Sequence, residues 1–234
     1  MTFASTLKRL RSSLTDSAGT IVFGMEDGTV SIFGLIFGVA ATTSDARTVL
    51  IAGASGAVAA AVSMMAGAFL DVETTRDEMK AKRATLQSAL SANPASIAAA
   101  LPGQLAAAGL TQQQSTALTG AVMRDREALD GLLLALHGSP EAPPDPWEQA
   151  LWMLLADFAA AAVPILPFVF LAVAQARVVS AAMTLALLIV LGVGRARIAG
   201  RSIARMVVET VSVGVAAALA GVAISVLISR TFTG

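Results

Sequence analysis

The chain has 234 residues, of which 56% are hydrophobic and only 14% are charged. Soluble domains carry about 25% charged residues, so this composition predicts a protein that is embedded in a lipid bilayer. The formal net charge is zero, which argues against a nucleic-acid partner. The absence of cysteine excludes disulfides and thiolate metal sites, and a single histidine leaves little from which to build a catalytic triad. We therefore expect an integral membrane protein and not an enzyme.

Residues 1–19 are basic and amphipathic, which predicts a short cytosolic helix on the membrane surface rather than a signal peptide. Beyond them, a bilayer core of about 30 Å requires about 20 apolar residues of helix. Five stretches meet this requirement, at 20–41, 49–70, 148–172, 178–194 and 206–229, and the fourth is the shortest. Pro164 and Pro167 predict a kink in the third span. The sequence thus predicts an all-α protein with five transmembrane helices.

The basic residues are distributed unequally between the two sides of this arrangement. If the N-terminus is cytosolic, 13 of the 16 lysines and arginines fall in inner segments, and only Arg47, Arg177 and Arg230 fall outside. Cytosolic loops of membrane proteins carry such an excess of positive charge. The pattern therefore predicts a cytosolic N-terminus and a C-terminus on the opposite side.

Residues 71–147 differ from the spans, because they hold more than half of the acidic residues and no apolar run long enough to cross a bilayer. We expect residues 71–91 to continue the second helix, Pro94 to begin another, and residues 111–137 to form a third, followed by a linker at 138–146. The predicted organisation is an N-terminal segment (1–19), two transmembrane helices (20–70), a cytosolic helical insert (71–147) and three transmembrane helices (148–234).

Apart from Glu148, the first residue of the third span, four acids lie inside the predicted spans: Glu26, Asp27, Asp157 and Glu209. Ionisable groups in a membrane are costly and are therefore functional candidates, and no lysine or arginine lies deep enough to pair with these acids directly. At about 1.5 Å per residue, Asp27, Asp157, Glu209 and Met64 of the second span all lie roughly 5–14 Å from the inner surface. Carboxylates with a thioether suit a transition metal better than magnesium or calcium.

The same residues also have simpler interpretations in which they do not bind a metal. Glu26 lies near the interface, where it would face water, and Met64 would fill a gap in the core. Glu209 follows Arg205 at the spacing of an i,i+4 ion pair, which is favoured over a ligand role. Asp157 is the deepest of the acids, and its plainer role is to cap or bridge helices.

Two pairs of glycines in the first span are each four residues apart: Gly24 with Gly28, and Gly34 with Gly38. Such spacing lets helix backbones approach closely. The pattern indicates either ordinary packing within one protomer or a symmetric contact of this helix across a dimer.

Four stretches resemble the vacuolar iron transporter family: IVFGMEDGTVSIFGLIFGVA, AVSMMAGAFLDVETTRDE, PWEQALWMLLADFAAAAVPILPF and GRSIARMVVETVSVGVAAALAGVAI. The resemblance extends over about residues 20–229. It implies a five-helix homodimer that moves ferrous iron, and often manganese, out of the cytosol in exchange for protons, along a pathway at the dimer interface. Asp27 and Met64 match the family's first-helix aspartate and second-helix methionine. Met123 and Glu127 match part of the metal-binding cluster of its insert.

The sequence also departs from the family at several positions. Thr20, Gly56 and Ala68 stand where relatives carry acids, and the insert is rich in alanine, glutamine and serine instead of glutamate. The resemblance is therefore to a bacterial-type member with a glutamate-poor insert, in which Asp157 or Glu209 would offset the missing second-helix glutamate.

These observations together predict a dimeric exporter of Fe²⁺ or Mn²⁺, coupled to protons, in a bacterial inner membrane. The metal would be the transported substrate, and no permanently bound cofactor is expected. Two alternatives remain open. One is a transporter of the same fold for a different cation, and the other is a non-transporting membrane protein whose insert binds a partner.

Overall fold

The computed structural model describes the chain except residues 1–12, 16, 93, 137–143 and 233–234, so most of the predicted surface helix lies outside the described residues. The chain divides into two compact units, one of Met1–Leu70 with Asp145–Gly234 and one of Asp71–Pro144. Among the described residues, five helices are long and apolar enough to cross a membrane: Ala18–Thr42, Ala46–Thr85, Pro146–Ile165, Val173–Ala199 and Ile203–Thr231. The predicted fold class is therefore confirmed, with five spans and a shorter helical region between the second and the third.

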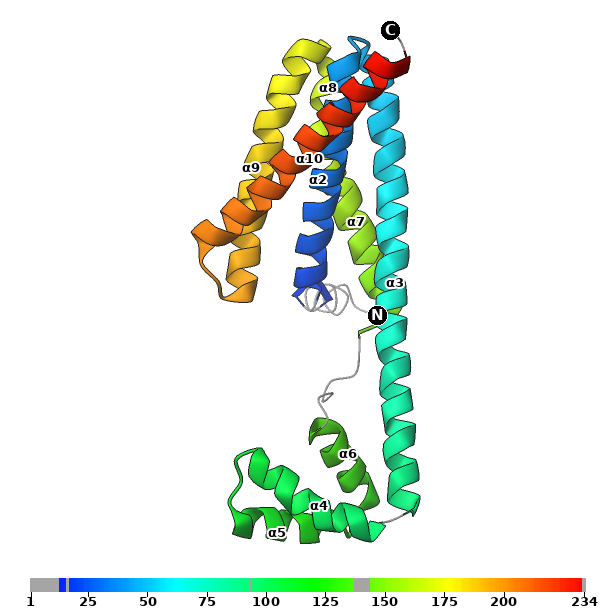
Figure 1. Cartoon of the computed structure of the whole chain (residues 1–234), viewed down its shortest axis with the longest axis vertical. Coiled ribbons are helices and arrows are strands. Elements are labelled where there is room, and N and C mark those ends of the chain that lie inside the picture. The colour runs from blue at the N-terminus through cyan, green and yellow to red at the C-terminus, as the bar shows by residue number, and fades with distance from the viewer. Residues whose placement is uncertain (1–12, 16, 93, 137–143, 233–234) are drawn as a thin grey trace, which may run out of the picture. The chain divides into compact units, whose positions relative to one another are not determined.

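The first unit is built around helix α2 (Ala18–Thr42), which packs against α7 (Pro146–Ile165), α9 (Val173–Ala199) and α10 (Ile203–Phe232) (Figure 1). The first part of helix α3 (Ala46–Ala92) belongs to this unit. Its buried residues Val49, Gly53, Ala57 and Ala61 are spaced four apart, so they lie on one face of the helix. The largest fully buried side chains of its hydrophobic cluster are Phe168, Ile32 and Ile36, and a few polar side chains are buried in the same unit.

Glycines of α2 allow the closest helix contacts in this unit. Gly24 and Gly28 pack against α7, whereas Gly34 and Gly38 pack against α10, where a Cβ on either residue would lie 2.9 Å or less from a main-chain oxygen. All four are buried within the protomer. The interpretation as intramolecular packing is confirmed, and the alternative of a dimer contact through these glycines is wrong because neighbouring helices already cover them.

The third predicted span is interrupted near its end. Helix α7 stops at Ile165, and the short helix α8 (Pro167–Phe170) follows before the backbone becomes extended at Leu171. Proline has no N–H for the helical hydrogen bond, so the helix cannot continue unchanged through Pro167. The prediction of one span through residue 172 is therefore wrong, and α7, with 20 residues, is the shortest span rather than α9, with 27.

The hydroxyl of Ser180 on α9 meets a main-chain carbonyl of α7 close to this interruption. Ser180 Oγ donates a hydrogen bond of 2.8 Å to the main-chain oxygen of Pro164. Both residues are buried, so the bond provides a partner that a carbonyl in an apolar setting requires. It ties α7 to α9 at the break.

The second unit contains the remainder of α3 and the helices α4 (Pro94–Ala107), α5 (Gln112–Val122) and α6 (Arg126–Leu136). The predicted continuation of the second helix and the start at Pro94 are confirmed. The single helix predicted at 111–137 is wrong, because Asp125 begins a new helix by accepting hydrogen bonds of 3.0 and 3.2 Å from the N–H groups of Glu127 and Ala128. A small core closes this unit, formed by Leu101, Leu105, Val122, Leu129 and Leu133.

Candidate metal site

Asp157 is the most unusual acid in the described part of the chain. It lies on α7 with 0% of its surface exposed. Neither carboxylate oxygen has a hydrogen-bond partner among the residues that the structure describes. It can lie so close to α2 because Gly28 has no side chain, and a Cβ there would overlap the main-chain oxygen of Asp157 and lie 2.9 Å from its Oδ1. A buried carboxylate in this state requires a proton or a cation.

Asp27 precedes Gly28 on α2 and lies close enough for its charge to repel that of Asp157. Its side chain is partly exposed, and within the described ranges no lysine or arginine forms an ion pair with either aspartate. The hydroxyl of Thr29, two residues after Asp27, already donates a hydrogen bond of 2.7 Å to the main-chain oxygen of Met25. The structure therefore brings together two of the predicted site residues as a pair of uncompensated carboxylates.

Glu26, in contrast, has two partners. Its carboxylate forms an ion pair of 3.2 Å with Arg195 Nη1 on α9 and accepts a hydrogen bond of 3.0 Å from Thr210 Oγ1 on α10. Its side chain is only 14% exposed. The expectation that no arginine reaches the acids is thus wrong for Glu26, and so is the alternative in which Glu26 faces water. The end of α9 packs against the start of α2, which carries the guanidinium to Glu26.

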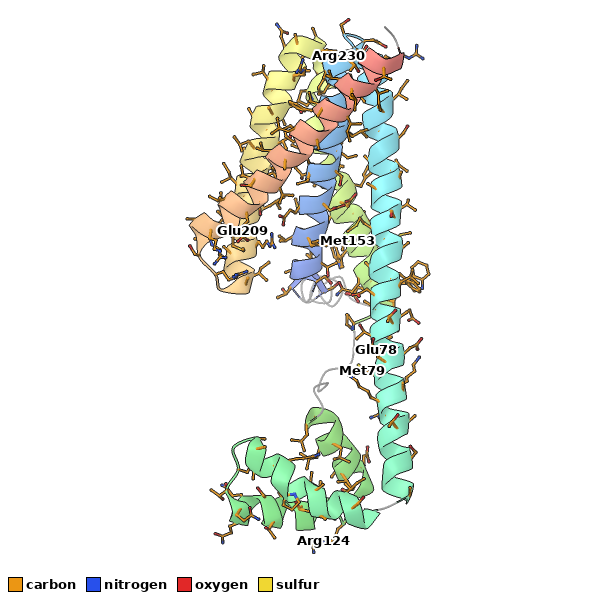
Figure 2. All side chains as sticks on the ribbon, viewed as in Figure 1. Glu78, Met79, Arg124, Met153, Glu209 and Arg230 are labelled. Carbon is orange, nitrogen blue, oxygen red and sulfur yellow. The ribbon has the colours of Figure 1, made fainter. Side chains whose placement is uncertain are left out.

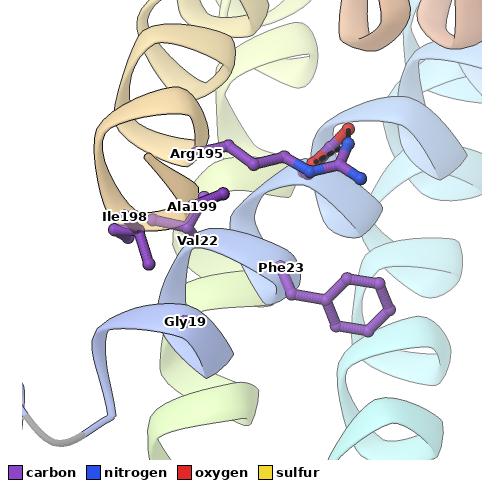
Figure 3. Close-up of a pocket in the computed structure, with 7 residues that line it drawn as sticks. Gly19, Val22, Phe23, Arg195, Ile198 and Ala199 are labelled. Carbon is purple, nitrogen blue, oxygen red and sulfur yellow. Dashed lines mark hydrogen bonds and ion pairs between the residues drawn. The ribbon is translucent and has the colours of Figure 1, made fainter. Parts of the chain in front are cut away.

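The ion pair between Glu26 and Arg195 borders a pocket of about 200 Å³. Figure 3 shows the arginine reaching across from α9 toward α2, above the apolar side chains that line the opening. The other lining residues are Gly19, Val22, Phe23, Ile198 and Ala199. Among the described residues of this lining, Glu26 is the only acid, and because Arg195 neutralises it they offer a cation no free carboxylate.

Glu209 on α10 is also paired. Its Oε1 lies 3.1 Å from Arg205 Nε, and its side chain is 42% exposed. The i,i+4 ion pair favoured by the sequence is therefore present. Figure 2 labels Glu209 on α10 and Met153 on α7, which are different helices of the unit. No contact between Glu209 and the two aspartates is found among the described side chains.

Met64 lies seven residues after the buried Ala57 on α3, and so it falls on the face by which that helix packs, although its side chain is partly exposed. Met123 and Glu127 belong to the second unit. Met123 packs against the small core there, while Glu127 is exposed in the first turn of α6. Within the described residues, no group of three or more histidine, aspartate or glutamate side chains is placed to hold a metal ion.

Met153, which is 5% exposed on α7, was not among the candidate ligands predicted from the sequence. Its Sδ lies 2.8 Å from where a Cβ on Gly24 would be. The signal was present in the sequence, because Met153 and Asp157 are four residues apart, as are Gly24 and Gly28. Arg195 was missed for a different reason, since nothing local to its segment indicates a partner 169 positions away.

Comparison with known proteins identifies the family. The model of the VIT family matches residues 18–226. Vacuolar iron transporter 1 of Oryza sativa subsp. japonica is 26% identical over 204 residues, covering 86% of this chain and 81% of that protein. Vacuolar iron transporter 1 of Tulipa gesneriana is 26% identical over 215 residues, covering 90% and 87%. This chain is accordingly a multi-pass integral membrane protein that belongs to the VIT family, a family of transporters and not of enzymes.

Proposed function

We propose that this protein carries a divalent transition metal, Fe²⁺ or Mn²⁺, out of the cytosol, with the metal as its substrate and no resident cofactor. The observation that carries the proposal is the buried, unpartnered carboxylate of Asp157 beside Asp27. Two carboxylates in a membrane without a basic partner are stable only with protons or a cation. The relatives named vacuolar iron transporter 1 support iron as the cargo.

Asp27 and Met64 are the proposed ligands of the transport pathway. The described residues of one protomer contain no cluster of three acids. We therefore place the pathway between two copies of the chain, which together provide two carboxylates and two thioethers. Glu26 and Glu209 are left out of this ligand set because arginines neutralise them. In the insert, Glu127 is exposed and available to a cation, whereas Met123 is partly buried against the small core.

Proton exchange follows from the same chemistry. When the metal leaves, the repulsion between neighbouring carboxylates is relieved by taking up protons, so metal and protons compete for the site. The distribution of lysine and arginine supports a cytosolic N-terminus. We propose a homodimer in a bacterial-type inner membrane that exports metal by proton antiport.

The test is uptake of Fe²⁺ and Mn²⁺ into proteoliposomes with an imposed pH gradient, comparing the parent with Asp27→Asn. The matched control is Asp45→Asn, which changes an exposed aspartate between α2 and α3. We expect uptake by the parent and the control, and loss of uptake in Asp27→Asn. If the folded parent transports neither metal, the proposal is refuted, and a panel of other cations then tests the alternative of a different cargo.

A further inference from the structure

We propose that Met153 and Asp157 of α7, together with Asp27 of α2, form a metal-binding station inside a single protomer. This inference rests on the proposed function, since it assumes that the protein handles a transition metal. It goes beyond it by adding a thioether that the pathway between protomers does not use.

The contact between α2 and α7 places Met153 and Asp157 against successive turns of α2, and Asp27 is the chain neighbour of Gly28 in one of these turns. Met153 Sδ lies against Gly24 and Asp157 Oδ1 lies against Gly28, on successive turns of both helices. Four residues of helix rise by about 6 Å, so the sulfur and the carboxylate oxygen are separated by a distance of this order. The side chain of methionine is unbranched and has three rotatable bonds, which allows its sulfur to approach a cation held by the carboxylate.

The unmet bonding capacity of Asp157 is the independent sign of a ligand. Its two oxygens have no partner among the described residues, and its nearest turn-neighbour on the same face presents a thioether. A thioether donates no hydrogen bond and carries no positive charge, so it leaves the carboxylate uncompensated. A cation is able to bind all three groups at once, because it accepts electron pairs from the sulfur and from both carboxylates.

The donor set also selects the class of cation. Magnesium and calcium prefer sites made only of oxygen, whereas a sulfur ligand favours softer transition metals. The station therefore favours Fe²⁺ or Co²⁺ over Mg²⁺. This preference would come from residues within one protomer.

The experiment measures Co²⁺ affinity of the full-length protein by equilibrium dialysis, in a Met64→Leu background that removes the thioether of the pathway between protomers. Met153→Leu and Asp157→Asn are then added separately, because both nearly conserve shape and so preserve the packing. The matched control is Met206→Leu, which changes another buried methionine of the same unit, on α10. Thermal unfolding confirms that each variant is folded.

We expect Met153→Leu and Asp157→Asn each to weaken Co²⁺ binding by about tenfold or more, the scale of losing a group that supports a metal site. Met206→Leu should leave the affinity unchanged. X-ray absorption of the bound Co²⁺ should show a sulfur neighbour that disappears with Met153→Leu. Affinity unchanged in both α7 variants, or abolished by Met64→Leu alone, would overturn the station even if the parent transports metal. Failure of the parent to transport any metal refutes the proposed function instead.

Discussion

Replacing Asp157 by asparagine should make the metal-free protein more stable. The neutral amide has nearly the same shape, and it removes a buried negative charge that Asp27 repels at a site where neither oxygen has a partner. A buried polar group without a partner costs about 1–3 kcal/mol, and more when it is charged. For a chain of this length, each kcal/mol shifts Tm by about 2–4 °C, so the expected increase is on the order of 5 °C.

The assay is thermal unfolding in detergent with a metal chelator, followed by tryptophan fluorescence. Trp147 and Trp152 both lie on α7, so the signal reports on the helix that carries the substitution. A fixed concentration of Mn²⁺ should then raise the Tm of the parent more than that of Asp157→Asn, because the stabilisation by a ligand grows with its affinity. If the chelated variant melts several degrees below the chelated parent, the carboxylate has a stabilising partner in the metal-free protein, and the reasoning is wrong.

Two further predictions concern stability. Gly28→Ala should lower Tm by several degrees, because its Cβ would overlap the main-chain oxygen of Asp157, whereas Gly67→Ala, with nothing within 4 Å, should not lower it. Asp45→Ala should lower Tm at neutral pH, because a hydrogen bond from the side chain of Thr48, followed by main-chain N–H groups, holds the pKa of this carboxyl below its ordinary value of 3.8. A lowered pKa stabilises the fold above the ordinary value and not below the folded-state value, so the difference in Tm from the parent should be the same at pH 7 and pH 5 and should shrink only as the pH falls below 3.8.

Local patterns determine most of the architecture. Lipid requires long apolar helices whose backbone groups are satisfied internally, so the five spans can be recognised from hydropathy without any partner. The start of α4 at Pro94 is also local, because proline suits the first turn of a helix. The end of α7 and the break at Asp125 depend on the hydrogen bonds of a few main-chain groups. The local sequence signals at these positions were too weak to predict where the helices end.

The sequence by itself determined which acids lie in the spans, and the i,i+4 pairing of Glu209 followed from helix geometry alone. Only the tertiary structure decided that Arg195 neutralises Glu26 while Asp157 remains buried without a partner. The reason is physical: whether a carboxylate in a membrane is paired depends on the side chains that neighbouring helices bring to it. Residues far apart in the sequence become neighbours only when glycines such as Gly28 let two helix backbones touch.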